Sequence, residues 1–208
     1  MGNHQKIIVM KKSVYVKKGI VALLVILGIA LLNSAYWLFS DKQDRCVEKI
    51  NSGKNLSVYE LASLATLHMG ICTVGWLYCP LAAEANMKMW TTRKDTVYIE
   101  SRSWVSPKIR KRIRNNEWGK VAWDGNEAYQ PSSPEKTAAL TLNWCMLKKM
   151  TIKDKPCVAA VCDYTWEKPS KTQFHLGFAT IRVYEQLFYE LEKRHVLHKF
   201  KLVCYYEE

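Results

Sequence analysis

Hydrophobic and polar positions divide the chain into an uncharged N-terminal stretch and a longer segment of mixed pattern. Residues 19–40 contain no charged side chain, and 20–32 are almost entirely Leu, Ile, Val and Ala. A helix rises about 1.5 Å per residue, so this stretch is long enough to cross a hydrocarbon core of about 30 Å. Tyr36 and Trp37 stand where an aromatic belt meets the membrane boundary. We therefore predict a transmembrane signal-anchor helix over 19–40.

The charges on either side of this stretch predict its direction. Only lysines precede it, with no acidic residue, whereas acidic and basic residues balance after it. By the positive-inside rule, 1–18 is a cytoplasmic basic N-terminus and the remainder is extracytoplasmic. We expect single-pass attachment to a bacterial inner membrane. Met10-Lys11-Lys12 resembles a bacterial start, which would make the first nine residues a misassigned extension. A cleaved signal peptide is the main alternative, although Asn33 does not suit its cleavage triplet.

A second uncharged stretch, 61–83, leaves the number of membrane crossings open. Ser57 and Glu60 have the capping-box spacing that starts a solvated helix. The stretch also holds His68, Pro80 and two glycines, so it is less apolar than 19–40. We predict buried core helices here, after a juxtamembrane linker over 41–56. In the alternative, 61–83 spans the membrane and the rest of the chain returns to the cytoplasm.

The remaining patterns predict an α+β class, with one N-terminal transmembrane helix followed by a single globular domain, 57–208, of mixed helices and a small sheet. Strand patterns occur over Asp95–Val105, Gly119–Trp123, Cys157–Tyr164 and Lys199–Tyr206. Helix patterns occur over 133–149 and 181–194, the second with Tyr184, Leu187, Phe188 and Leu191 on one face and a Glu190–Arg194 pair. The last strand, helix and strand fit either a parallel crossover or an antiparallel arrangement.

Composition is typical of a folded domain, and only part of the net positive charge belongs to that domain. Hydrophobic residues make up 49% of the chain and charged residues 24%, which is ordinary for a globular protein. The net charge is +12, but five of these charges are the lysines before the anchor. All seven cysteines follow the anchor, and no two have C-x-x-C spacing. Several lie in apolar runs, so we predict buried thiols rather than a disulfide framework.

A run of basic residues after the first predicted strand is the leading candidate for a binding surface. It contains Arg102, Lys108, Arg110, Lys111, Arg112 and Arg114. Trp104 and Trp118 flank it, and cations beside aromatic rings suit phosphates, anionic lipid headgroups or acidic glycans. Nucleic acid is an unlikely partner for an extracytoplasmic domain. The alternative is an ordinary solvated surface.

A second candidate for ligand contact is the segment that follows the Gly119–Trp123 strand. Its aromatic and polar side chains are Trp123, Asp124, Asn126, Glu127 and Tyr129. Such a set can bind a sugar or a peptide through ring stacking and hydrogen bonds. A turn that carries core aromatics explains the same residues.

Catalytic patterns in the sequence are weak. Ser133 and Lys136 match the S-x-x-K spacing of serine acyl-transferases, but neither S-D-N nor K-T-G occurs, and a helix N-cap explains Ser133. Cys162, Asp163 and His175 could supply a thiol nucleophile with a base. A packed Cys and a surface His are the simpler interpretation. We predict no metal site and no cofactor.

The sequence therefore favours a membrane-anchored, non-catalytic binding or assembly subunit of the bacterial cell envelope. Its expected partners are the lipid bilayer and other envelope proteins. One alternative is an envelope hydrolase with a Cys/His or Ser nucleophile. Another is a two-pass membrane protein whose basic cytoplasmic domain contacts anionic lipid or nucleic acid.

Overall fold

Mixed helices and a mixed sheet make up the structure, which confirms the α+β class. The computed structural model describes 28–122, 144–166, 171–175 and 180–208, with positions 21, 25, 138, 141 and 142. The helices are α2 (Lys42–Asn51), α3 (Val58–Tyr78), α4 (Pro80–Thr91), α5 (Pro107–Arg114) and α7 (Glu185–Lys193). The strands are β1 (Thr96–Glu100), β2 (Gly119–Ala122), β3 (Trp144–Ile152), β4 (Lys155–Tyr164), β5 (Lys171–His175), β6 (Thr180–Tyr184) and β7 (Phe200–Glu207).

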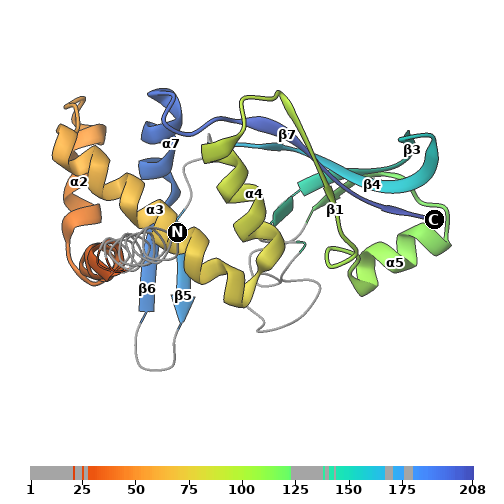
Figure 1. The fold of residues 1–208 in the computed structure, drawn as a ribbon, viewed down its shortest axis with the longest axis horizontal. Coiled ribbons are helices and arrows are strands. Elements are labelled where there is room, and N and C mark those ends of the chain that lie inside the picture. Colours follow the sequence, from red (N-terminus) through yellow and green to blue (C-terminus); the bar gives the residue numbers. More distant parts are fainter. Residues whose placement is uncertain are drawn as a thin grey trace, which may run out of the picture.

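The main sheet has five strands in the order β1-β7-β4-β3-β2, and β5 pairs with β6 in a separate hairpin. β1 runs parallel to β7, whereas the other neighbouring strands of the main sheet are antiparallel. β4 and β7 are therefore adjacent and antiparallel, which is the antiparallel arrangement and not the parallel crossover. In Figure 1, α2, α3 and α7 gather at one end of the molecule, and α5 lies beside the sheet at the other end.

Alternation along the strands places two apolar clusters on opposite faces of the main sheet. On β1, Val97 and Ile99 are buried and Tyr98 is exposed, as the sequence predicts. The larger cluster joins this face to α3, α4, α5 and α7. The smaller cluster, on the other face, consists of Cys157, Ala159, Val203 and Tyr205. β4 and β7 are thus buried on both faces, which is why Val203 does not alternate outward as expected.

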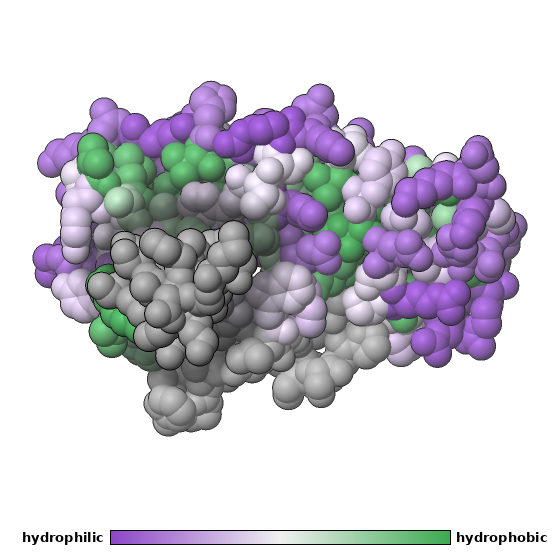
Figure 2. Space-filling view, in the orientation of Figure 1, coloured by the Kyte–Doolittle hydropathy of each residue, from purple (hydrophilic) through white to green (hydrophobic). Residues whose placement is uncertain are grey.

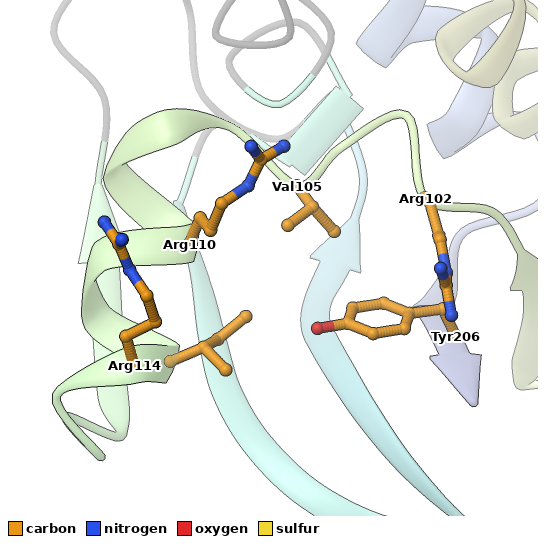
Figure 3. A pocket seen from close by; sticks show the side chains of 6 residues that line it. Arg102, Val105, Arg110, Arg114 and Tyr206 are labelled. Atoms are coloured by element: carbon orange, nitrogen blue, oxygen red, sulfur yellow. The ribbon is translucent and has the colours of Figure 1, made fainter. Parts of the chain in front are cut away.

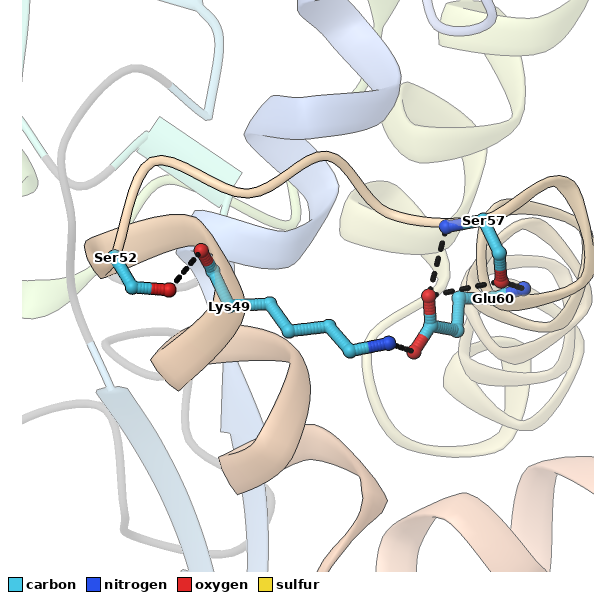
Figure 4. Close-up of polar contacts among 4 residues, drawn as sticks. All are labelled: Lys49, Ser52, Ser57 and Glu60. Atoms are coloured by element: carbon cyan, nitrogen blue, oxygen red, sulfur yellow. Dashed lines mark hydrogen bonds and ion pairs between the residues drawn. The ribbon is translucent and has the colours of Figure 1, made fainter.

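α3 begins at the predicted capping box, which lies in an exposed turn. The Ser57 side chain accepts a hydrogen bond from the Glu60 backbone N–H, and the Glu60 carboxylate accepts one from the Ser57 backbone N–H. Lys49 of α2 donates to the same carboxylate at 2.5 Å, so the cap also joins two helices (Figure 4). Leu64 and Leu67 are fully buried. Residues 61–83 thus lie in two helices, α3 and α4, which both contribute side chains to the core of the domain.

A helix precedes α2, described at 21, 25 and 28–39; we call it the N-terminal helix. It contacts α3 through Ser34, whose hydroxyl donates to the backbone carbonyls of Ala30 at 2.8 Å and of Thr66 at 3.3 Å. Trp37 is buried, and its carbonyl accepts a hydrogen bond from Gln43 of α2. The predicted anchor over 19–40 lies only partly within the described residues. Among those residues, no helix is long and apolar enough to cross a membrane.

Two predicted helices are wrong in part. The predicted helix over 133–149 is helical at 138, 141 and 142, but Trp144–Ile152 is strand β3. Residues 145 and 147 are buried and 146 is exposed, so an alternating pattern was concealed within the helical one. The pairs that β3 forms with β2 and β4 decide in favour of the strand.

The second correction concerns 181–194. Thr180–Tyr184 is strand β6, which pairs with β5, and α7 begins only at Glu185. Leu187, Phe188 and Leu191 are buried on α7 as predicted. Glu190 pairs with Lys193 instead of Arg194, whose guanidinium donates to Asn55. β-branched residues at 181 and 183 favour the strand over the helix at this point.

Candidate anion-binding site

The basic run is built around α5, a helix that the sequence prediction missed. The Ser106 side chain caps it by accepting a hydrogen bond from the Ile109 backbone N–H at 3.2 Å, and Pro107 fills the first helical position. Ile109 is fully buried and holds α5 against the core. The opposite side of the helix therefore carries its basic residues toward solvent. Figure 2 shows hydrophilic surface covering the end of the molecule that holds α5.

A groove with a volume of about 350 Å³ lies between α5, the loop after β1 and the end of β7. Its lining residues are Arg102, Val105, Arg110, Ile113, Arg114 and Tyr206. In Figure 3, Arg110 and Arg114 project from α5 on one wall, Arg102 and Tyr206 form the opposite wall, and Val105 lies between them. Three guanidinium groups and one phenol thus surround an apolar floor.

Arg102 is held in place by its neighbours. Its guanidinium carbon lies 5.0 Å from the centre of the Tyr206 ring, and Nη2 donates to the Glu207 backbone carbonyl at 3.1 Å. A cation over an aromatic face and a hydrogen bond to a carbonyl both limit the rotamers that this side chain can adopt. One wall of the groove is therefore preorganised.

Arg110 and Arg114 lack such partners. In the described part of the chain, neither side chain forms an ion pair or a hydrogen bond. They stand four residues apart on one helix face, where like charges repel each other. The acidic residues that follow Tyr206 in sequence form ion pairs with lysines: Glu207 pairs with Lys155 at 2.7 Å and Glu208 with Lys149 at 3.6 Å. An anion between the two arginines would relieve this repulsion.

Tyr206 supplies a hydrogen-bond donor to the groove. Burial and the Glu208 carboxylate raise the pKa of its phenol above the ordinary value, while Arg102 and Arg110 oppose the rise. The hydroxyl therefore keeps its proton at neutral pH. Guanidinium and phenol donors around one small space are what a phosphate or a similar oxyanion needs.

The other residues of the predicted basic cluster lie outside the groove. Lys108 donates to the Ala122 carbonyl at 2.8 Å, and Arg112 reaches the Glu117 carbonyl at 3.4 Å. Lys111 is exposed on α5. These three side chains add positive potential around the groove without lining it.

The aromatic partner of the site is not the one that the sequence suggested. Trp104 is fully buried and packs against Tyr206, with ring centres 5.9 Å apart. The Trp118 indole donates to Asn116 and lies 5.4 Å from the Lys149 ammonium. Tyr206 could not be identified from the sequence because β7 meets β1 only through a parallel pairing between distant segments. Its position at the end of the last predicted strand was the only signal.

The predicted thiol site is not arranged for nucleophilic chemistry. Cys162 is buried on β4, and burial, Cys145 and Asp163 raise its pKa to about 12. Asp163 is exposed on the next position of the strand, where side chains point to the opposite face. His175 belongs to β5, and its side chain lies outside the description. All seven cysteines are buried and free, which confirms the prediction of buried thiols.

The remaining candidates lie outside the described residues. These are Ser133, Lys136, Trp123, Asp124, Asn126, Glu127 and Tyr129. Over the residues that the structure describes, no three His, Cys, Asp or Glu side chains come together as a metal site. No known protein family, curated protein or solved structure matches this chain.

Proposed function

We propose that this protein is a membrane-anchored, non-catalytic binding subunit of a bacterial envelope, and that the groove beside α5 holds a phosphate-bearing anion. The observation that carries the proposal is the pair Arg110 and Arg114, which have no acidic partner among the described residues and face the fixed Arg102 across a small groove. Like charges four residues apart on a helix face repel each other by roughly 0.2–0.5 kcal/mol, and a bound oxyanion would replace this repulsion with charge-assisted hydrogen bonds.

The uncharged sequence over 19–40 and the charges that flank it support attachment to a membrane. The uncharged stretch over 19–40 has the length of a bilayer span, and only basic residues precede it. We place the N-terminus in the cytoplasm and the domain outside. α3 contributes the buried side chains of Leu64, Leu67 and His68 to the domain, so it belongs to the domain and is not a second span in this proposal.

A binding role is favoured over catalysis by the state of the titratable groups. Burial holds the pKa of Cys72, Cys145 and Cys162 near 12, so these thiols carry their protons at neutral pH. A thiol nucleophile needs the opposite shift. The groove itself holds guanidinium groups and a protonated phenol, which bind an anion but do not accept a proton from a substrate.

The test measures anion binding by the full-length chain in a neutral detergent. Tripolyphosphate and short-chain phosphatidylglycerol serve as separate probes, one soluble and one lipid-derived. Each charge-assisted hydrogen bond contributes roughly 1.5–3 kcal/mol, so Arg110→Ala together with Arg114→Ala weakens binding at least tenfold. The control replaces Arg93 and Lys94 by Ala, which removes the same charge from the exposed loop before β1.

Each result has a defined meaning. Binding that falls only in the α5 variant supports the groove. Equal losses in both variants would show that net charge alone attracts the anion, and binding of neither probe would refute the site. The probe that binds more tightly identifies the source of the phosphate, a lipid headgroup or a soluble ligand.

A further inference from the structure

α3 has an outer face that is unusual for a helix of a water-soluble domain. Between Glu60 and the end of the helix there is no charged residue. Its outward positions recur every three or four residues, and we call them the α3 stripe: Tyr59, Ala62, Thr66, Met69, Thr73 and Trp76. Tyr59 is 68% exposed, and Met69 and Trp76 are each 46% exposed. A surface helix normally turns charged and polar side chains outward.

The threonines of the α3 stripe do not offer hydroxyl groups to a partner. Thr66 Oγ1 donates to the Ala62 carbonyl, and Thr73 Oγ1 donates to the Met69 carbonyl, each at 2.9 Å. A threonine hydroxyl that donates its proton back into its own helix has no donor left for another partner, and its methyl group faces outward. The stripe therefore has no free side-chain donor between Ala62 and Met69, which suits an apolar surrounding and not a hydrated one.

The N-terminal helix carries a matching stripe on its own outer side. Its positions are Val25, Ile29, Leu32, Tyr36 and Phe39, and each is more than half exposed. In Figure 1 this helix, red to orange, is seen close to end-on, whereas α3 runs across the picture. The two helices thus cross each other. Figure 2 shows apolar surface at this helical end of the molecule.

The crossing point fixes how deep α3 lies relative to the anchor. Asn33 Nδ2 reaches the Ser63 carbonyl at 3.4 Å, and Ser34 Oγ reaches the Thr66 carbonyl at 3.3 Å. Tyr36 follows two residues later, about 3 Å along the helix. The ammonium of Lys42 lies 6.0 Å from the centre of the Tyr36 ring, so an aromatic ring and a cation lie close together near this end of the N-terminal helix. This combination is typical of the headgroup boundary.

We infer that α3 lies in the headgroup–acyl boundary of the bilayer that the N-terminal helix enters, with the α3 stripe against lipid. The inference rests on the membrane attachment proposed above. A helix that crosses the anchor at the level of Tyr36 runs along the membrane surface and not through it. Trp76 and Tyr59, near the two ends of the stripe, have the amphipathic rings that favour this depth.

Lipid is the partner that the observations favour over a second protein. The α3 stripe lies beside the N-terminal helix, whose part of the sequence, 19–40, holds no charged residue. One apolar surface therefore continues from this helix onto the domain. Polar groups border it: the Lys49–Glu60 pair lies at the start of α3, and the Arg45–Asp41 pair follows the N-terminal helix. An apolar stripe beside an anchor and bordered by charges fits a membrane surface.

The test uses thiol labels on the full-length chain in phosphatidylcholine vesicles. The native cysteines are buried, so Met69→Cys and Thr73→Cys each add one accessible thiol to the stripe. Thr151→Cys, exposed on β3, is the matched control. A fluorophore at 69 or 73 should be quenched several-fold more by a nitroxide lipid labelled near its headgroup than by aqueous iodide. The order should reverse at 151.

The outcomes separate the two proposals. If labels at 69 and 73 respond to iodide as the label at 151 does, while the chain still floats with the vesicles, α3 does not contact lipid and only the anchor remains. If neither quencher reaches 69 or 73, a protein covers the stripe and the inference is wrong. A chain that does not float with vesicles would refute the membrane attachment itself.

Discussion

Gly70 allows α3 and the N-terminal helix to approach closely, and replacing it tests that contact. A Cβ added at Gly70 would lie 2.4 Å from Ser34 Oγ and 3.1 Å from Ser34 Cβ. Gly75, five residues further along α3, is the matched control. A Cβ there would meet the Ala83 Cβ at 3.4 Å, an ordinary van der Waals distance. Gly70→Ala and Gly75→Ala therefore make the same chemical change in one helix, with and without a clash.

The expected magnitudes follow from three contributions. Replacing Gly by Ala inside a helix contributes about 1 kcal/mol of stability, and this gain applies at both sites. At position 70 the Ser34 hydroxyl must rotate away, which breaks its bonds to the carbonyls of Ala30 and Thr66. Each bond contributes about 1 kcal/mol, and overpacking in a fixed contact costs about 1–3 kcal/mol. We expect Gly75→Ala to stabilise the fold by about 1 kcal/mol. The gain of about 1 kcal/mol at Gly70→Ala is outweighed by the two lost bonds and the overpacking, so this variant should be destabilised by roughly 2–4 kcal/mol.

Urea unfolding of the full-length chain in neutral detergent, followed by tryptophan fluorescence, measures the difference. The midpoints of the two variants should separate at an unchanged m-value. Ser34→Ala removes the closest atom of the clash, so the double variant with Gly70→Ala should recover much of the loss. Equal stabilities of Gly70→Ala and Gly75→Ala, or additive effects at 34 and 70, would refute the close helix contact.

Three further predictions concern titratable groups. Burial raises the pKa of the Glu60 carboxyl, but hydrogen bonds from Lys49 and Ser57 outweigh it and lower this pKa from 4.5 to about 2. The ionised carboxylate therefore stabilises the fold fully above pH 4.5, and this stabilisation is lost as the pH falls through 2. Glu60→Gln should remove this part of the acid unfolding curve. Burial lowers the pKa of His68 to about 3 from 6.5. The unfolded chain binds a proton that the folded chain does not, so stability rises with pH between these values, by up to about 1.4 kcal/mol per pH unit, and His68→Gln should flatten this slope. The seven buried cysteines should resist a water-soluble thiol reagent at mildly alkaline pH and react together after denaturation; rapid reaction of any one in the native chain would contradict the burial.

Local features of the fold were predictable where short-range chemistry determines them. The Ser57–Glu60 capping box needs only residues within one helical turn, and it starts α3 as expected. The alternation of Val97 and Ile99 with Tyr98 reports a strand with one buried face. The continuous apolar run of β4 reports a strand buried on both faces. In each case the pattern lies within one element, so no distant contact had to be known.

The errors arise where a local pattern fits two structures. Residues 145–147 satisfy both helical spacing and strand alternation, and only pairing with β2 and β4 selects the strand. The segment that forms α5 reads as a run of charges, although it begins with Ser106 as a cap and Pro107 at the first helical position. The high charge of the segment concealed that signal.

The candidate site could be predicted only in part. The basic residues were identified from the sequence, but the groove also needs Tyr206, which the β1–β7 pairing brings beside Arg102. That pairing is parallel and joins segments about a hundred residues apart in sequence. The register between such segments depends on the whole sheet and cannot be deduced from the sequence of either strand alone. For the same reason the sequence could not identify which arginines line the groove.

In the proposed arrangement, one helix attaches the chain to a membrane and the whole domain lies on one side of it. The most direct test adds single thiols on either side of α3 in the full-length chain, with Lys54→Cys before it and Thr151→Cys after it. Both sites are exposed, and the native cysteines are buried. A membrane-impermeant thiol reagent added to intact bacterial spheroplasts should label both sites. Labelling of 54 alone, with 151 reached only after the membrane is opened, would show that α3 crosses the bilayer and that the domain does not lie on one side of it.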